Sequence, residues 1–296
     1  MAQTSDIRRQ IDSVGKTRQI TDAMRRIAYV KMSHARKRAE SLRPYTRALI
    51  RVVARLMRVD RDYVPALMRV RPQRRIGLIV VSTDRGLCGA LNARLLALCQ
   101  QQIEQWQGQG CQVVVTAIGS RGAQALTRAG HAPQAEATHI GDVPDLDVEA
   151  LLGAISVPLH QFLDGQIDAI HVASNHFVNA LKHQPRVLRF APFDPALGRD
   201  LPSTGQGGLA IDYLYEPDPH TVIDGVLLRY VEAGILRAII ENLACEHSAR
   251  MTAMQSASDN ASRLIDELTH RYHKTRQEAI TRELAEIVSG AQALMS

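Results

Sequence analysis

The sequence predicts an α/β domain inserted between two long terminal helices that pair as an antiparallel coiled coil. Three observations favour this fold class. Residues 221–296 contain no proline, and glycine stands at only three positions among them. The first 57 residues carry apolar side chains at helical spacing. Between these two ends, short apolar runs alternate with helical segments, as they do in α/β proteins.

The N-terminal helix is expected over residues 5–57. Ile7, Ile11 and Val14 open a stripe with three- and four-residue spacing, which places them on one face of a helix. Pro44 interrupts this pattern. A proline inside a helix removes one backbone hydrogen bond and collides with the preceding turn, so we expect a kink or a break there.

Four apolar runs in the middle of the chain are typical of strands: residues 75–82, 111–119, 167–177 and 185–193. Continuous apolar runs such as RIGLIVVS predict strands that are buried on both faces of a mainly parallel sheet. Helical segments follow the first two runs, and another precedes the third. This alternation predicts a Rossmann-like domain.

A helix over residues 221–296 would be about 110 Å long at 1.5 Å per residue, which is too long to be covered by one domain core. It needs a partner helix, and the N-terminal segment is the candidate of suitable length. Because that segment is shorter, the end of the C-terminal helix should protrude alone. The expected division is an N-terminal helix (1–58), the Rossmann-like domain (75–208) and a C-terminal helix (213–296).

Composition and charge restrict the classes of protein to which this chain could belong. The chain has no run of about 18 apolar residues that would span a membrane and no apolar segment near its start that would act as a secretory signal. Its four cysteines show no C-x-x-C spacing, which favours free thiols. Residues 1–75 carry 20 Lys and Arg against 6 Asp and Glu, so an acidic partner should meet this part of the chain.

No motif in the chain predicts chemistry. The glycine-rich segments 84–92 and 119–122 lack the lysine and spacing of a phosphate-binding P-loop, and segment 205–210 follows a loop rather than a strand. His171 and His176 lie five positions apart on an expected strand, so they face opposite sides and do not share a metal. Neither catalytic residues nor a cofactor or metal is therefore expected.

The basic segment 25–40 leaves an alternative open, a coiled-coil protein that binds nucleic acid through a basic helix. Leucine is missing at regular heptad positions, and the α/β insertion would separate the two arms of such a protein. A third reading is an α/β enzyme with helical arms. Binding of nucleic acid or nucleotide to the isolated chain would distinguish these readings.

Several long blocks of the sequence carry a resemblance to a known family. They are IRRQIDSVGKTRQITDAMRRIAYVKM (7–32), STDRGLCGALN (82–92), YLYEPDP (213–219), ENLACEHSARMTAMQSASDNA (241–261) and RYHKTRQEAITRELAEIVSGAQAL (271–294). In order and spacing they resemble the γ subunit of F-type ATP synthases. The family usually has Ser where Cys245 stands and Asn where His273 stands, so the chain is a divergent member, and its lack of a transit peptide favours a bacterial one.

The resemblance implies a function as the central rotor shaft of the complex, itself without catalytic residues. The implied partners are the α3β3 hexamer, the ε subunit and the c-ring of the membrane sector, at the cytoplasmic face of the bacterial inner membrane. Ion flow through the c-ring would turn the shaft, and the shaft would change the catalytic sites of β in sequence. The Met and Ala residues of segment 251–261 are expected to present a smooth surface to the surrounding sleeve.

The resemblance also implies contact residues. Met24, with Arg25 and Arg26, matches a contact to an acidic loop of β. Glu246 and Arg250 match a contact near the hinge of β. The remaining expected contacts are Arg276, Gln277 and Thr281 toward a β catch region, and Tyr213, Tyr215 and Glu216 toward ε and the c-ring.

Overall fold

A computed structural model describes residues 2–56, 63–142, 145–194 and 216–295. The chain forms two compact units. The first joins Met1–Ala28 to Arg250–Ser296, and the second comprises Tyr29–Ala249. The described elements are α1 (Ala2–Ser41), α2 (Arg43–Leu56), the short 3-10 helix η1 (Ala66–Met68), β1 (Arg75–Val81), α3 (Leu91–Gly108), β2 (Gln112–Ile118), α4 (Ser120–Arg128), β3 (Ala135–Ala137), α5 (Val148–Leu163), β4 (Ala169–Phe177), β5 (His183–Ala191) and α6 (Pro219–Met295).

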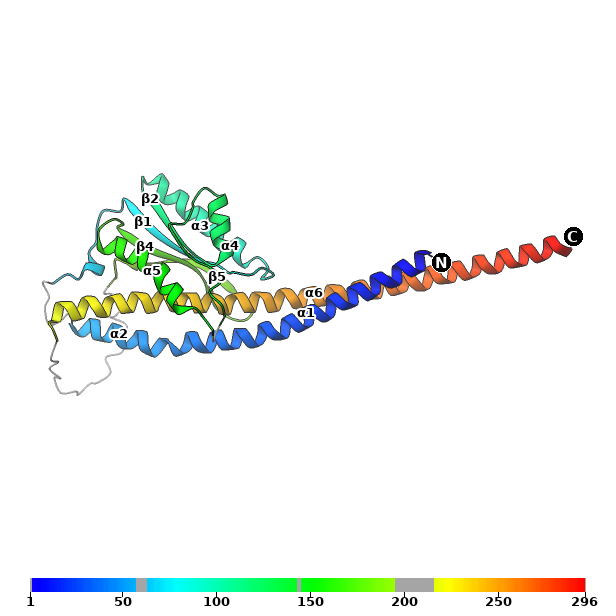
Figure 1. Cartoon of the computed structure of the whole chain (residues 1–296), viewed down its shortest axis with the longest axis horizontal. Helices are drawn as coiled ribbons and strands as arrows, with labels where there is room; N and C mark the ends of the chain where they lie inside the picture. Colours follow the sequence, from blue (N-terminus) through cyan, green and yellow to red (C-terminus); the bar gives the residue numbers. More distant parts are fainter. Residues whose placement is uncertain (1, 57–62, 143–144, 195–215, 296) are drawn as a thin grey trace. The chain divides into compact units, whose positions relative to one another are not determined.

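The second unit contains the expected α/β domain (Figure 1). Its five strands lie in the order β3-β2-β1-β4-β5. β1 pairs in parallel with β2 and β4, and β2 pairs in parallel with β3. β5 is antiparallel to β4, because a connection of only five residues allows a hairpin but no crossover. β3 was not expected from the sequence, since it has three residues and contains Glu136.

Alternating side chains of the sheet build one core on each face. Ile76, Leu78 and Val80 of β1 pack in one cluster with the apolar side of α3 and α4. Ile79 and Val81 point to the other face. They belong to a larger cluster with α5 and the first turns of α6, whose fully buried members include Ile223, Leu227, Val231, Ile235 and Ile239.

The break expected at Pro44 is present. α1 ends at Ser41 and α2 begins at Arg43, with the Thr46 amide donating a hydrogen bond to the Leu42 carbonyl over 3.1 Å. Proline is accepted in the first turn of α2, because backbone N–H groups there have no partner within the helix.

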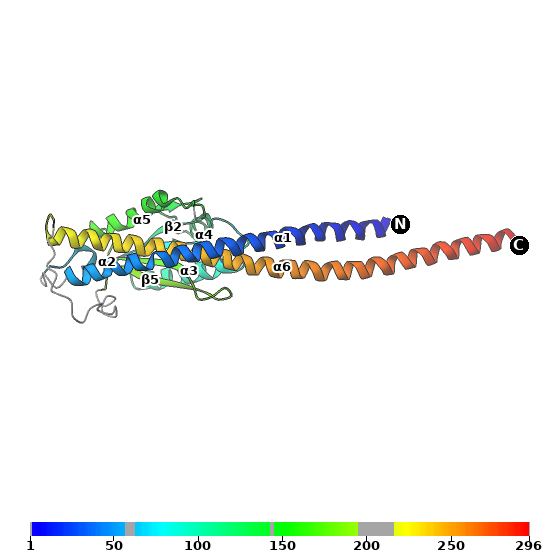
Figure 2. The same cartoon turned by 90° about the horizontal axis from the view of Figure 1, so that it is seen from below.

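The first unit is an antiparallel pairing of two helices, the start of α1 and the later part of α6 (Figures 1 and 2). On α1 the positions that are buried or half-buried recur at Thr4, Ile7, Ile11, Val14, Thr21, Arg25 and Ala28. On α6 they recur at Met254, Ser258, Ala261, Ile265, Leu268, Tyr272, Thr275 and Ala279. Both series repeat every seven residues, which is the spacing of a coiled-coil seam. Both views show α6 continuing past the start of α1.

Among the described residues, no helix is both long enough and apolar enough to cross a membrane.

Candidate functional site

A buried cluster of polar side chains lies where α6 crosses the carboxyl ends of β1 and β4, within the second unit. In open α/β sheets ligands bind at this point, where the strand order reverses. Here the side chain of Asn242 from α6 fills it. Its Oδ1 accepts hydrogen bonds from the Asn175 backbone amide (3.2 Å) and side-chain amide (2.9 Å), and its Nδ2 donates to the Ser82 carbonyl (3.2 Å). All three residues are buried, so the position holds a helix instead of a ligand.

Glu241, the neighbour of Asn242, makes a second attachment to the end of β4. Its Oε1 lies 2.5 Å from Nδ1 of His176 and accepts the Phe177 backbone amide at 3.2 Å. Its other oxygen accepts from Arg186 of β5 at 3.4 Å. The carboxylate therefore joins α6 to both strands of the hairpin.

Asp142 makes a third attachment, from the loop before α5. Its Oδ1 lies 2.6 Å from Nε2 of His247 on α6, and its Oδ2 lies 2.7 Å from Nζ of Lys31 on α1. Since an ionised carboxylate can only accept, Nε2 of His247 carries the proton. The bond from His247, together with that from Lys31, outweighs the effect of burial and holds the pKa of Asp142 well below its usual range.

Asp84, in the segment STDRGLCGALN, orders the start of the same loop. Its carboxylate accepts hydrogen bonds from the backbone amides of Ser120, His139 and Ile140 and from the Ser120 hydroxyl, over 2.8–3.0 Å. Burial alone would raise the pKa of Asp84, but these bonds outweigh it and lower the pKa. This segment therefore shapes a loop instead of binding a phosphate group.

The four cysteines are buried, and none of them forms a disulfide. Cys88 and Cys245 belong to one small apolar cluster with Leu91. Burial raises the pKa of the Cys99 thiol to about 12 and also raises that of Cys245. A thiol with such a pKa is a poor nucleophile at neutral pH. Within the described residues, no group of three or more His, Cys, Asp or Glu side chains is placed to hold a metal ion.

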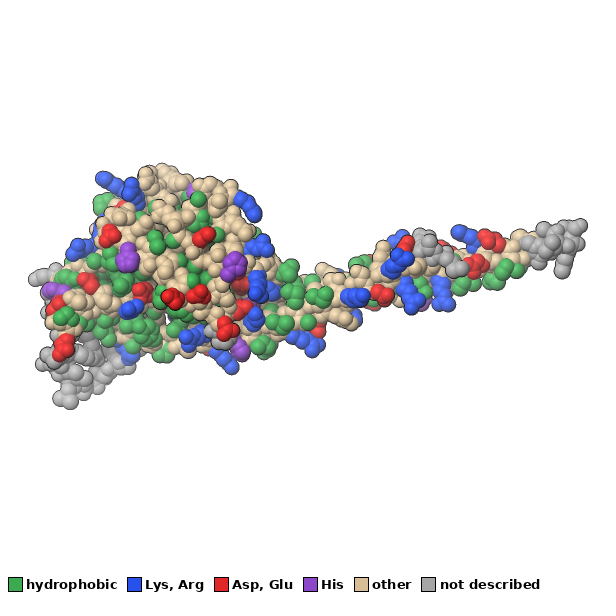
Figure 3. All heavy atoms as spheres, viewed as in Figure 1, with side chains coloured by type: hydrophobic (Ala, Val, Ile, Leu, Met, Phe, Trp, Pro, Cys, Tyr) green, Lys and Arg blue, Asp and Glu red, His purple; other side chains and the backbone are tan. Residues whose placement is uncertain are grey.

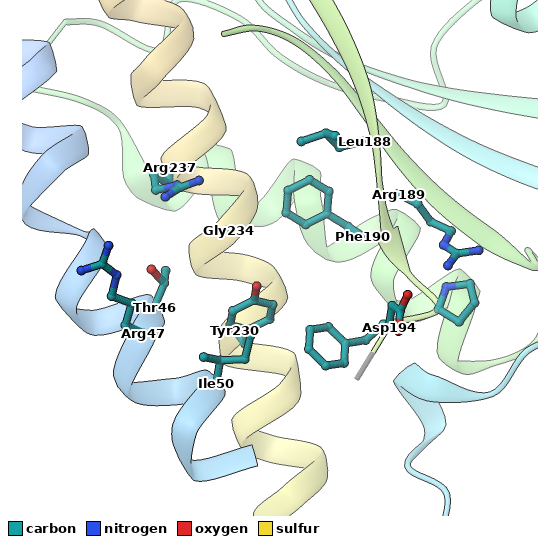
Figure 4. A pocket seen from close by; sticks show the side chains of 12 residues that line it. Thr46, Arg47, Ile50, Leu188, Arg189, Phe190, Asp194, Tyr230, Gly234 and Arg237 are labelled. Atoms are coloured by element: carbon teal, nitrogen blue, oxygen red, sulfur yellow. The ribbon is translucent and has the colours of Figure 1, made fainter. Parts of the chain in front are cut away.

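A cavity of about 530 Å³ lies between α2, β5 and α6 (Figure 4). Phe190 and Tyr230 line its apolar part, and Arg47 and Arg237 stand at its side. Gly234 leaves room for the Phe190 ring, since a Cβ there would lie 2.8 Å from the ring edge. The arginines favour an anionic group, but the lining offers no arrangement for acid–base or nucleophilic chemistry.

Met24, Arg25 and Arg26 lie in the first unit on α1. Asp22 accepts from both arginines, at 2.7 Å from Arg25 and 2.9 Å from Arg26, so the pair has less free positive charge than the sequence alone suggests. Met24 is half-buried, and it follows Ile20 and precedes Ile27 on one helical face where both isoleucines are exposed. This apolar strip lies beside the coiled-coil seam and is open to a partner.

Glu246 and Arg250 are both buried, at 5% and 9% exposure, and both interact within the chain. Each belongs to a different compact unit. Their side chains offer little surface to another subunit in this structure. Contact of these two residues with β stays a prediction.

Arg276, Gln277 and Thr281 are exposed on α6. Gln277 and Thr281 share a face with the exposed apolar residues Leu284 and Val288, because the steps of four, three and four residues follow the helix period. Figure 3 shows apolar side chains among charged ones along this end of α6. The four side chains thus form one exposed strip.

The prediction that Met and Ala residues present a smooth surface to a surrounding sleeve is wrong about where these residues lie. Met254 and Ala261 are buried in the coiled-coil seam, at 5% and 8% exposure. The part of α6 beyond the start of α1 exposes larger side chains, Ile280, Leu284, Ile287 and Val288. Small residues in the seam let the two helices approach closely, which explains the composition without a sleeve.

The structure describes only part of the last group of expected contacts, those toward ε and the c-ring. Glu216 is exposed just before α6, while Tyr213 and Tyr215 lie outside the described residues. Sequence reasoning missed Asn242, Asp142 and the role of His247. Asn242 and His247 stand inside a long amphipathic pattern, where the only signal was a polar side chain on the apolar face; Asp142 stands in a loop without any periodic signal.

Comparisons with known proteins agree on one family. A family profile described as ATP synthase matches residues 3–294. The ATP synthase gamma chain of Polynucleobacter asymbioticus is 44% identical over 294 residues, covering 99% of this chain and 100% of that one. The gamma chain of Cupriavidus necator is 44% identical over 297 residues, with coverage of 99% and 100%.

Solved structures share the fold. A chain in the cryo-EM structure of the Euglena gracilis mitochondrial ATP synthase (OSCP/F1/c-ring, rotational state 3) aligns with a TM-score of 0.66 at 18% identity, covering 99% of this chain and 95% of that one. A chain of the rotor from the same organism aligns with a TM-score of 0.63. From the full-length match to bacterial gamma chains, the chain described here belongs to the ATP synthase family, among its gamma chains.

Proposed function

We propose that this chain is the central rotor shaft of a bacterial F-type ATP synthase. One structural observation carries the proposal: α6 is a single helix that continues past the start of α1 and exposes apolar side chains there. A helix of this kind is poorly stabilised in water by itself and calls for a surrounding partner. In the proposed complex the α3β3 hexamer is that partner, and the chain itself carries out no chemistry.

The shaft would couple distant sites by its asymmetry. Two helices of unequal length present a different side to each β subunit of a threefold sleeve. Each orientation then favours one β conformation and its nucleotide affinity, which is a coupling free energy between separate sites. Ion flow through the c-ring would turn the shaft and drive ATP synthesis, and hydrolysis would turn it backwards.

The partner contacts follow from the exposed strips. The strip of Ile20, Met24 and Ile27, flanked by Arg25 and Arg26, fits an acidic and partly apolar loop of β. Residues 276–288 of α6 fit the inside of the hexamer. Glu216 and the tyrosines at 213 and 215 are proposed to face ε and the c-ring, at the cytoplasmic face of the inner membrane.

Reconstitution tests the proposal. The chain is mixed with bacterial α and β subunits, and a bead is attached through a cysteine introduced at exposed Gln107. The introduced thiol can be labelled selectively because the four native cysteines are buried. We expect a complex of one chain per α3β3 hexamer whose bead rotates in one direction with ATP. A chain that fails to enter the hexamer, or a complex whose bead does not rotate, would refute the shaft function.

A further inference from the structure

We propose that Asp142 is a positioning residue that makes both shaft helices turn together with the α/β domain. The inference rests on the proposed function and deepens it. Asp142 lies in the loop before α5, and its two carboxylate oxygens bind different helices: Lys31 of α1 at 2.7 Å and His247 of α6 at 2.6 Å. All of these residues belong to the second unit.

The nature of the bonds matters for a rotating part. Apolar packing is non-directional, so two apolar faces resist separation better than they resist sliding past each other. Hydrogen bonds have preferred distances and angles, and those between charged groups are the strongest. His247 is almost fully buried, with 4% of its side chain exposed, which protects its bond to Asp142 from competing water. The Asp142 contacts therefore resist sliding of either helix along or around the domain.

Residues 139–141, which lead to Asp142, are positioned by hydrogen bonds to Asp84 and by their own backbone geometry. Asp84 accepts the backbone amides of His139 and Ile140, both at 3.0 Å. His139 has a φ of +58° and Gly141 a φ of +78°, and a Cβ on Gly141 would lie 2.6 Å from the Asp145 carbonyl oxygen. Glycine adopts a positive φ readily, but at His139, which has a Cβ, this conformation persists only where the surroundings hold it. The loop thus presents the Asp142 carboxylate at a fixed place between α1 and α6.

Other residues also attach α6 or α1 to the same domain, and comparison with them shows what Asp142 adds. Asn242 and Glu241 bind α6 to the ends of the strands, and Arg36 of α1 lies 6.0 Å from the centre of the Phe177 ring. Phe177 also meets both helices, because its ring lies under Arg36 and its amide donates to Glu241, but only the second of these contacts is a hydrogen bond, whereas Asp142 makes a charged hydrogen bond to each helix. Asp142 binds both, so its loss should loosen α1 and α6 against the domain at once.

The test uses the complete ATP synthase in vesicles, with Asp142→Asn and the matched control Asp145→Asn, an exposed position in the same loop. For each variant, ATP hydrolysis and ions pumped per ATP are measured at equal amounts of assembled complex. We expect Asp142→Asn to hydrolyse ATP but pump fewer ions per ATP, and Asp145→Asn to equal the parent. In the same complexes, amide hydrogen exchange at residues 139–142 should be roughly tenfold faster in Asp142→Asn.

A second pair of variants guards against an assembly defect in Asp142→Asn. Lys31→Met removes the charge from a side chain that is 36% exposed, and Lys31→Arg keeps it. We expect Lys31→Met to pump fewer ions per ATP than the parent chain, and Lys31→Arg to pump as many as the parent chain. Equal pumping per ATP in all assembled variants, or parallel losses of hydrolysis and pumping, would overturn the inference. If the parent chain itself fails to couple, the proposed function fails instead.

Discussion

At the residue scale, His171 is a half-buried titratable group that bears on stability and not on the contacts of the shaft. It lies on β4 with its ring centre 4.8 Å from that of Trp106, and its Nδ1 is buried without a hydrogen-bond partner among the described residues. Burial, with Arg189 nearby, lowers the pKa of His171 to about 4. The folded chain thus keeps this imidazole neutral at physiological pH.

This lowered pKa predicts a loss of stability in acid. Between about pH 6.5 and 4 the unfolded chain binds a proton at His171 and the folded chain does not. The free energy of unfolding therefore falls as the pH falls. The full effect is about 3 kcal/mol. His171→Phe keeps a ring beside Trp106 and removes the titration, so its melting temperature should fall less between pH 7 and pH 4.5 than that of the parent chain.

The matched control for this prediction is His160→Gln, an exposed histidine on α5. It should show the pH profile of the parent chain. If the profile of His171→Phe also runs parallel to the parent, the acid sensitivity does not come from His171.

At the scale of single elements, two glycines of α6 make opposite predictions. Gly225 has open space where a Cβ would be added, whereas a Cβ on Gly234 would lie 2.8 Å from the Phe190 ring. Gly225→Ala should therefore stabilise the chain by about 0.5–1 kcal/mol, because alanine loses less backbone freedom in a helix. Gly234→Ala gains the same stabilisation from reduced backbone freedom, but its Cβ forces the Phe190 ring to move, which costs about 1–3 kcal/mol.

Denaturant unfolding of the two alanine variants checks this pair. A fall in the free energy of unfolding for Gly234→Ala, beside a rise for Gly225→Ala, is the expected outcome. A rise for both would mean that Phe190 does not pack against α6. Because the two substitutions are identical, their difference isolates the contact between β5 and α6.

At the scale of the whole molecule, the exposed strip of α6 should contribute to the stability of the complex and not to that of the free chain. Leu284 and Val288 are more than half exposed, at 58% and 56%. Replacing both with serine should leave the melting temperature of the free chain within about 1–2 °C of the parent, since exposed substitutions usually change stability by less than 0.5 kcal/mol. The same double variant should lower the thermal stability of the complex with α and β.

The measurement is a melting curve for the free chain and an activity-loss curve for the complex. Glu283→Ser with Glu286→Ser serves as the control, since both positions are exposed on the same stretch of α6. The proposed burial of α6 in the hexamer would be contradicted if the Leu284 and Val288 variant and this control lost activity at the same temperature.

The charge asymmetry of the chain belongs to this scale as well. The excess of Lys and Arg in residues 1–75 predicted an acidic partner. In the structure some of these cations already have partners in the chain, since Asp22 binds Arg25 and Arg26 and Asp142 binds Lys31. Total charge therefore overstates how much positive surface the helix offers to another subunit.

The sequence by itself determined the long helices and four of the five strands of this protein. Helical periodicity located α1 and α6, Pro44 predicted the break before α2, and runs such as RIGLIVVS predicted buried strands. These features depend on neighbours within a few positions, so local pattern is enough to find them. The resemblance of the long blocks then identified the family.

Only the tertiary structure decided how these elements are joined. The place of Asn242 at the strand ends and the bonds of Asp142 both depend on residues far apart in the chain. Asp142 and His247 stand 105 positions apart, and Asp142 and Lys31 stand 111 apart. No periodicity links such positions, because it is the sheet and the packing of α6 across it that bring them together.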